Sequence, residues 1–462
     1  MKQGESYAGS RVTVMGLGLH GGGVSAARYF ARHGAVVTVT DLRDERELAS
    51  SVEVLEDVPV RFVLGTHEEA DFKDADIVIK NPAVPRTSPY LALARRIETD
   101  ISVFLTQSST RLVAVTGSKG KSSTSAAVHH ILSTTIGNSY LGGNITNSPL
   151  EFAEEAGPHS TVVLELSSFQ LGDLEMTPGG IAALRPDIAM ITSIFPDHLN
   201  YYRSMAEYVA DKRLIYAGQG PGDWTIARDD EYGTSFLAET PARRAVLCDH
   251  PIAGAGNAWE AYAYLDGHIG FACTEGHDED VVPEHLLVAG IHMRRNLLAA
   301  ALAARLLGVD ASAAREAVSS FPGIGHRLEH VRERNGIHFY NDSAATIPEA
   351  ALEAVSAFEA PVHLIAGGSV KNIDLGLFGR ISERVARVYL LQGSAAAAIS
   401  SVTHEHKLAG PFDSLASALH AAVSNARRGD VVILSPGCAS FGMFQNEFDR
   451  GRQFRDLVAN LE

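Results

Sequence analysis

The sequence has few cysteines and no excess of basic residues. Its three cysteines, Cys248, Cys273 and Cys438, lie far apart in a chain of 462 residues. This number and spacing argue against a disulfide framework and against a zinc cluster, so we expect ordinary buried thiols. The net charge is −16 at pH 7, which argues against a nucleic-acid partner. Any anionic ligand must therefore be neutralised by local basic groups and Mg²⁺.

The sequence also lacks a long apolar run. Its longest apolar helical segment, residues 297–309, is interrupted by Arg305 and is too short to cross a bilayer. The first six residues have no apolar core of the kind found in secretory signals. We therefore expect a cytoplasmic protein that does not bind membranes.

The length and the 45% apolar content suggest about three domains, each with its own core. Short β-branched runs alternate with alanine-rich helical segments, which is typical of parallel α/β sheets. The fold class we predict is α/β, with three parallel-sheet domains: a Rossmann-like domain at 1–109, a central P-loop-like ATPase domain at 110–321 and a second Rossmann-like domain at 322–462. Segment 321–328, which contains Pro322, is the expected linker before the third domain.

The first domain begins with a pattern that suits nucleotide binding. A strand at 11–15 runs into the glycine-rich turn 16–23, a helix and a second strand that ends at Asp41. Such turns accept a diphosphate at the following helix, and an acid in this place can bind a sugar hydroxyl or a base. The glycine pattern is not a clean fingerprint, because Gly22 and Gly23 crowd the helix start. A tight turn needed only for packing is the alternative.

The most informative segment is residues 113–124, Val-Ala-Val-Thr-Gly-Ser-Lys-Gly-Lys-Ser-Ser-Thr. An apolar strand runs into a glycine turn, and a lysine-hydroxyl pair then opens a helix. Glycines let backbone N–H groups converge on phosphate oxygens, Lys121 would neutralise the outer phosphates, and the Ser122 hydroxyl would ligate Mg²⁺. Val115 stands where the strict P-loop pattern has glycine, so a basic surface turn remains the alternative.

Charged residues near two later strands are further candidates. Glu165 lies inside the apolar run 161–166, where burial is costly unless the carboxylate meets a cation. We favour Mg²⁺ as its partner, against a hydrogen bond to Ser167 or to a backbone amide. His198 follows the next strand and could contact a second metal or a phosphate. Lys212, in a predicted helix, would by default be a solvated surface charge.

Loops follow the predicted strands of the third domain at their carboxyl ends, where ligands collect in parallel sheets. They cover residues 341–343, 367–371 and 435–440. Taken singly, each of these loops is better explained as a structural turn than as a site.

Taken in order, these motifs resemble the Mur ligase family, the ATP-dependent amino-acid ligases of peptidoglycan synthesis. The resemblance spans nearly the whole chain, and the run Leu-Glu-Leu-Ser-Ser-Phe-Gln at 164–170 is particularly specific. Its other carriers are residues 116–122, 141–145, 197–198, 210–215, 325–327, 341–343 and 434–440.

The resemblance implies a first domain that binds uridine diphosphate, a central ATPase domain, and a third domain that holds the incoming amino acid and closes over ATP. It implies UDP-N-acetylmuramoyl-L-alanine and D-glutamate as substrates, ATP as co-substrate, two Mg²⁺ ions and a monomeric chain.

The resemblance also implies roles for individual residues. The catalytic set is Lys121, Glu165, His198 and Lys212. The metal ligands are Ser122, Glu165, His198 and, if it is carbamylated, Lys212. The ATP-binding residues are Gly117, Ser118, Lys119, Gly120, Lys121, Ser122, Ser123, Asn296, Arg327 and Asp342. The UDP-substrate residues are Leu19, His20, Asp41, Arg43 and Asn144. The amino-acid site comprises Thr346, Lys371, Ser440 and Phe441.

Several positions depart from the family pattern. Met293, Ala344 and Gly442 stand where Asn, Lys and Asp are usual, and Glu447 with Phe448 replaces an aromatic residue followed by an acid. Losing a lysine near the acceptor could change which amino acid is taken. Three hypotheses follow: a ligase that adds D-glutamate, which we favour; a related ligase that adds L-glutamate or another amino acid, including folylpolyglutamate synthase-like chemistry; and a catalytically degenerate nucleotide-binding scaffold. The retained phosphoryl-transfer residues argue against the scaffold.

Overall fold

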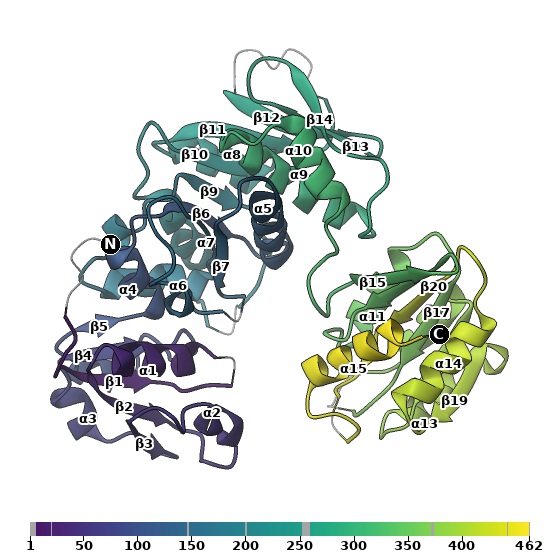
Figure 1. Cartoon of the computed structure of the whole chain (residues 1–462), viewed down its shortest axis with the longest axis horizontal. Coiled ribbons are helices and arrows are strands. Elements are labelled where there is room, and N and C mark those ends of the chain that lie inside the picture. Colours follow the sequence, from purple (N-terminus) through teal and green to yellow (C-terminus); the bar gives the residue numbers. More distant parts are fainter. Residues whose placement is uncertain are drawn as a thin grey trace. The chain divides into compact units, whose positions relative to one another are not determined.

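The computed structural model describes residues 6–19, 21–145, 147–198, 201–251, 259–370, 374–440 and 442–461. Within these residues the strands form three sheets, which Figure 1 shows in sequence colours. The chain divides into two compact units: Met1–Pro283 with Asn296–Val318, and Glu284–Arg295 with Ser319–Glu462. The first unit contains the first two sheets, and one apolar cluster runs through both of them.

The first sheet is built by an alternation of short strands and helices. Its elements are β1 (Arg11–Met15), α1 (Gly22–Arg32), β2 (Val36–Asp41), α2 (Ala49–Glu53), β3 (Val60–Leu64), α3 (Glu69–Lys73), β4 (Ile77–Lys80), β5 (Ile97–Glu98) and α4 (Asp100–Gln107). The strand order is β3-β2-β1-β4-β5, and all pairs are parallel. Because the order reverses between β1 and β4, a crevice opens at their carboxyl ends.

The second sheet is longer and contains the central segment of the chain. Its elements are β6 (Arg111–Thr116), α5 (Lys121–Thr135), β7 (Ser139–Gly143), β8 (Thr161–Glu165), α6 (Ser168–Asp173), β9 (Ile188–Ile191), α7 (Met205–Arg213), β10 (Trp224–Arg228), α8 (Glu231–Glu239), β11 (Arg243–Cys248), β12 (Ala261–Asp266), β13 (Ile269–Cys273), β14 (Asp278–Val282), α9 (Ile291–Leu306) and α10 (Ala311–Ser319). The order is β14-β13-β12-β11-β10-β9-β6-β8-β7. The expected parallel sheet is extended by antiparallel β13 and β14, because only two residues join β12 to β13.

The third sheet lies in the second unit. Its elements are β15 (Glu329–Arg334), β16 (Ile337–Asn341), α11 (Pro348–Ser356), β17 (Val362–Ala366), α12 (Leu377–Arg384), β18 (Arg387–Leu391), α13 (Ala396–Val402), β19 (Leu408–Phe412), α14 (Leu415–Asn425), β20 (Val431–Leu434) and α15 (Glu447–Ala459). The order is β15-β16-β20-β17-β18-β19. β15 is antiparallel to β16 because Asn335 and Gly336, both with positive φ, form a two-residue hairpin turn.

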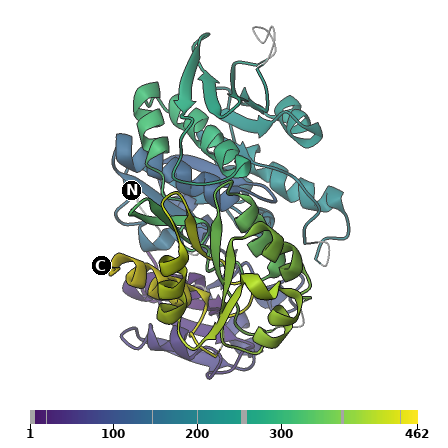
Figure 2. The same cartoon turned by 90° about the vertical axis from the view of Figure 1, so that its right-hand side faces the viewer.

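Both faces of the third sheet are covered by helices, as Figure 2 shows. One apolar cluster packs Phe339 and Val432 against α14 and α15, and a second packs Leu364 and Ile433 against α11 and α12. A parallel sheet covered on both faces explains why its strands are continuous apolar runs in the sequence. The three α/β sheets confirm the predicted fold class.

Two expectations from composition can be checked directly. The three cysteines are free and buried, as expected, and burial raises the pKa of Cys248 to about 12 and that of Cys438 to about 11. Among the described residues, no helix combines the length and the apolar character needed to cross a bilayer.

Candidate active site

The turn between β6 and α5 has the geometry of a phosphate-binding loop. Gly117 and Gly120 have φ angles of 145° and 86°, in a region that other L residues rarely adopt. A Cβ atom on Gly117 would lie 2.0 Å from Thr192 Oγ1, so space as well as conformation requires glycine there. The loop leads directly into the N-terminus of α5, where backbone N–H groups and the helix dipole favour anions.

The segment after β9 holds this loop in place. The Ser118 hydroxyl donates to the carbonyl of Phe195 and accepts from its N–H, each at 2.9 Å. Thr192 Oγ1 donates to the carbonyl of Lys119 at 2.6 Å. Sequence reasoning placed Ser118 and Lys119 at the phosphate site. The Ser118 hydroxyl is used inside the protein, and its backbone N–H donates to the carbonyl of Ser193 at 2.6 Å, so Ser118 shapes the loop and does not offer a donor to a ligand.

The side chains of Lys121 and Asn296 lie next to this loop. Lys121 Nζ donates to the carbonyls of Gly117 and Ser118 at 2.9 and 3.2 Å, so its ammonium lies over the loop. A Cβ on Gly120 would lie 2.8 Å from Asn296 Oδ1. The structure therefore brings Asn296, in α9, to the loop that also contains the partly buried Ser122 and Ser123.

Glu165 ends β8, the strand beside β6, and its side chain is 1% exposed. Its Oε1 accepts from Asn144 Nδ2 at 2.8 Å, while its Oε2 is buried and has no hydrogen-bond partner among the described residues. The alternative hydrogen bond to Ser167 does not form, because the Ser167 hydroxyl donates to Gln170 instead. An unpaired buried carboxylate oxygen is costly and is the kind of ligand Mg²⁺ prefers. Glu165 Oε2 is therefore a suitable ligand for a divalent cation.

Lys212, in α7, is 1% exposed, which excludes the solvated surface charge that a helical lysine would be by default. Its Nζ donates to the carbonyl of Gly117 at 2.9 Å and lies 4.6 Å from the centre of the Tyr208 ring. Burial, and then the nearby charge of Lys121, lower the pKa of Lys212 to about 7. Much of this amine is therefore neutral near physiological pH.

His198 differs from these buried groups because its side chain is 46% exposed. Its backbone has a φ of 53°, which is uncommon for a residue other than glycine. Its ring packs against Phe169 with centroids 4.9 Å apart. This strained, accessible histidine is thus held at the rim of the site by an aromatic contact.

A hollow of about 430 Å³ lies between the first two sheets. The first sheet contributes Asn81 and Asp100 to its lining, and the second contributes Asn144, Phe169 and Tyr201. Asn144 also donates to Glu165, so the hollow adjoins the metal-compatible carboxylate.

A second hollow, of about 550 Å³, lies at the crevice between β1 and β4. Asp41 and Arg43 line it, and the Asp41 carboxylate accepts from the N–H groups of Gly18 and Arg43 at 3.1 and 3.0 Å. Leu19 is exposed beside this turn, and His20 lies outside the described residues. The fixed acid at the end of the second strand is where the sequence pattern predicted it.

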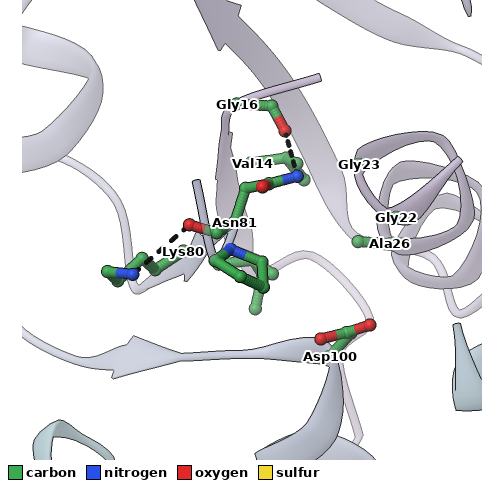
Figure 3. A pocket seen from close by; sticks show the side chains of 10 residues that line it. Val14, Gly16, Gly22, Gly23, Ala26, Lys80, Asn81 and Asp100 are labelled. Atoms are coloured by element: carbon green, nitrogen blue, oxygen red, sulfur yellow. Dashed lines mark hydrogen bonds between the residues drawn. The ribbon is translucent and has the colours of Figure 1, made fainter. Parts of the chain in front are cut away.

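Asn81 was missed by sequence reasoning, although it lines both hollows and a smaller cavity beside them. Figure 3 shows its amide directed at Gly16, to whose carbonyl it donates at 3.2 Å, and Asp100 across the cavity. The available signal was a polar residue before proline, directly after a buried strand.

Three loops meet at one edge of the third sheet. Asp342 follows β16 and accepts from Ser435 Oγ at 2.6 Å and from the Leu328 N–H at 3.1 Å. Burial raises the pKa of Asp342 to about 7. Two backbone hydrogen bonds join Ser369 to Ala439 and so link the loops after β17 and β20. Ser440 is buried, Thr346 is half-buried and Arg327 is exposed, whereas Lys371 and Phe441 lie outside the described residues.

Arg450 is a second residue that sequence reasoning missed, and it is completely buried. Its guanidinium donates to the hydroxyl and the carbonyl of Ser343, each at 2.9 Å, and to the carbonyl of Cys438 at 3.2 Å. It therefore ties the loop after β16 to the loop after β20. No local sequence signal distinguishes this arginine from a surface residue of the same helix.

A phosphate-binding loop with a buried acid and lysine lies next to a hollow shared by the first two sheets, an arrangement that suits an enzyme acting on a nucleotide and a second substrate. Sequence models of three domains match this chain: the Mur ligase MurD-like N-terminal domain at residues 10–103, the Mur ligase middle domain at 115–304 and the Mur ligase glutamate ligase domain at 326–438. The chain belongs to the Mur ligase family, whose members are ATP-dependent, amide-bond-forming ligases.

Individual relatives agree over nearly the full length. A UDP-N-acetylmuramoylalanine–D-glutamate ligase of Roseiflexus sp. is 40% identical, with 98% of this chain and 99% of the relative covered. A protein of the same name from Treponema pallidum is 37% identical, with 97% of each covered. The solved UDP-N-acetylmuramate-alanine ligase MurC of Thermotoga maritima superposes with a TM-score of 0.58 at 19% identity, covering 97% of this chain and 99% of that one. At that identity the structural likeness shows the shared fold alone.

Proposed function

We propose that this chain joins D-glutamate to UDP-N-acetylmuramoyl-L-alanine through an acyl phosphate, in the cytoplasmic stage of peptidoglycan synthesis. The observation that most strongly supports this chemistry is that Asn144 both lines the hollow between the sheets and donates to Glu165. An acid bound in the hollow would lie near a nucleotide bound on the phosphate loop. The names of the relatives from Roseiflexus and Treponema supply the identity of the acid and of the amino acid.

The chemistry explains why such a site is needed. A carboxylate is a poor acylating agent because its leaving group would be an oxide. The γ-phosphoryl group of ATP is therefore transferred to the alanyl carboxylate, and the amine of glutamate attacks the resulting acyl phosphate. The tetrahedral intermediate then expels phosphate. Lys121 and the backbone N–H groups of the loop offset the charge on the transferring phosphoryl group.

Mg²⁺ bound here would supply further charge neutralisation to the phosphates. We assign two Mg²⁺ ions to this site. Their ligands would be Ser122, Glu165, His198 and carbamylated Lys212. The unpaired Oε2 of Glu165 and the low pKa of Lys212 support this assignment. A carbamate turns that lysine from a cation into an anion.

We assign the remaining predicted residues by the part of the substrates they would contact. Leu19, Asp41 and Arg43 would contact the uridine nucleotide, and Asn144 the muramoyl group. Asn296, Arg327 and Asp342 would contact ATP, and Thr346 and Ser440 the glutamate. The domain boundaries that go with these roles are 1–109, 110–321 and 322–462, in a monomeric chain.

One assay tests the proposed function. Phosphate release from ATP is measured with UDP-N-acetylmuramoyl-L-alanine and, in turn, D-glutamate, L-glutamate, L-lysine and diaminopimelate. We expect release with D-glutamate. Release only with another amino acid would support the related ligase that the substitution at Ala344 suggests. If phosphate is released with none of these amino acids, the result would favour the hypothesis of a catalytically degenerate nucleotide-binding scaffold.

The carbamate on Lys212 gives a pH-dependent prediction. Only the neutral amine reacts with CO₂. With a pKa of about 7, roughly one tenth of the amine is neutral at pH 6 and roughly nine tenths at pH 8. At a fixed concentration of dissolved ¹³CO₂, we expect a carbamate carbonyl resonance in the ¹³C NMR spectrum that grows over this interval. The variant Lys212→Met should lack it. A resonance of equal intensity in that variant would show that the carbamate is elsewhere.

A further inference from the structure

The loop between β4 and β5 places one charged side chain away from the two hollows. Its residues Asn81, Ala83 and Pro85 line both hollows, and Thr87 lines the larger one. Arg86, between Pro85 and Thr87, points instead into the helices of the second sheet. The same loop therefore lines the two hollows on one side and contacts α6 and α7 of the second sheet on the other.

Arg86 binds two acids there. Its Nε donates to Asp173 Oδ1 at 3.2 Å, and its terminal nitrogens donate to both oxygens of Asp211. Lys80 donates to the other oxygen of Asp173 at 2.5 Å, and Tyr202 donates to Asp211 at 2.8 Å. Figure 3 shows the Lys80 side chain leaving the small cavity. These five side chains, which we call the interdomain network, join the first sheet to α6 and α7.

The guanidinium of Arg86 packs directly against the backbone of α6 at Gly172. A Cβ on Gly172 would lie 1.6 Å from a terminal nitrogen of Arg86 and 2.2 Å from its central carbon. The backbone of Gly172 does not have positive φ, so conformation does not require glycine at this helical position. The absence of a side chain is needed to admit Arg86.

Two partners of the network belong to helices that also carry site residues. Asp211 immediately precedes the buried Lys212 on α7. Asp173 ends α6, whose residue Phe169 lines the hollow and packs against His198. Through Asp211 and Asp173, Arg86 is therefore connected to the helix that contains Lys212 and to the helix that contains Phe169.

Stability alone is a weak reason for such an arrangement. Taking charges out of water costs about as much as their pairing returns, and well-packed apolar residues often serve as well or better. The Lys80 and Asp173 side chains are each 1% exposed. What the network does supply is a fixed geometry, because an arginine fork accepts carboxylates only in defined directions.

We propose that Arg86, seated on Gly172, is a positioning residue that sets the register between the substrate-binding loop and the helix that contains Lys212. The proposal rests on the proposed function, since register matters when one domain holds the acid and the other holds the phosphoryl donor. A misplacement of about 1 Å between reacting groups can cost on the order of 10² in rate. Arg86 itself touches neither reacting group.

The sharpest test is Gly172→Ala, which adds one methyl group beneath the guanidinium. Alanine favours the helical conformation more than glycine does, so α6 should not be weakened. We expect kcat for phosphate release to fall by about tenfold to a hundredfold, while KM for ATP stays within about twofold of wild type. Hydroxylamine trapping of the acyl phosphate should fall in parallel with kcat. The control is Gly222→Ala, where a Cβ meets nothing within 4 Å.

A second variant, Arg86→Met, removes the charge and keeps an unbranched side chain. We expect the same fall in kcat, and the double variant with Gly172→Ala should be no slower than the slower single variant, because both changes disrupt one interaction. Arg185→Met, at an exposed arginine in the segment before β9, is the matched control.

The outcomes are distinct. Turnover within about twofold of wild type in both variants would overturn the proposal, and so would losses that multiply in the double variant. A lower unfolding temperature with a raised KM for ATP would also overturn it, since that result indicates general damage to the fold. Wild-type protein that gives no turnover with any amino acid would refute the proposed function, and this proposal with it.

Discussion

Replacing Lys121 by alanine is expected to lower kcat by at least a factor on the order of 10²–10³, the loss that follows removal of one preorganised donor at a site of developing charge. The ammonium group lies over the phosphate loop, within 2.9 Å of the Gly117 carbonyl. Lys212 is held by the same carbonyl, but as a carbamate it would be anionic and could not replace the lost positive charge. The measurement is phosphate release at saturating substrate concentrations.

The matched control for this variant is Lys73→Ala. Lys73 is exposed and pairs only with Glu69 in the neighbouring turn of α3, among its described contacts. Its removal should leave turnover within about twofold of wild type, as is usual for surface changes of this kind. Near-normal turnover in Lys121→Ala itself would remove this lysine from the catalytic set.

The second large effect is expected for Glu165→Gln. A glutamine has the shape of glutamate and can still accept the hydrogen bond from Asn144, but its amide nitrogen replaces the unpaired Oε2. We expect kcat to fall on the order of 10² and the Mg²⁺ concentration needed for half-maximal rate to rise at least about tenfold, because a charged metal ligand has been lost. Both follow from phosphate-release rates over a Mg²⁺ titration.

The control here is Glu175→Gln, at an exposed acid shortly after α6. It removes one negative charge from the same part of the chain without touching the site. An Mg²⁺ titration curve for Glu165→Gln that coincides with those of this control and of wild type would show that Glu165 is not a metal ligand.

Much of the fold could be predicted because its strands are short, β-branched and buried on both faces. The strand predicted at 362–366 is β17, for example, and the glycine turns after β1 and β6 begin where they were expected. The antiparallel strands β13 to β15 were not predicted, since the strand-helix rhythm describes crossovers only. Asn335 and Gly336 did contain a hairpin signal that this rhythm does not use.

For the site, local motifs predicted which residues take part, but they did not predict how buried those side chains are or which residues they contact. The phosphate loop and Glu165 could be recognised because glycine, lysine and an acid in an apolar strand have few other uses. The burial of Lys212 could not be recognised, because it depends on Thr116 and Gly117, about 95 residues away in the sequence. The same is true of Arg86, whose partner Asp211 is 125 residues away, a distance over which pattern and propensity contain no information.

The three buried thiols have a practical consequence. Cys248 ends β11 and Cys273 ends β13 of the second sheet, and Cys438 lies in the loop after β20, so each compact unit contains at least one natural reporter. A thiol reagent can reach them only when the surrounding structure opens, and alkylation under native conditions therefore measures the opening free energy of each unit separately. Peptide mass analysis would assign each label to its unit without introducing any foreign probe.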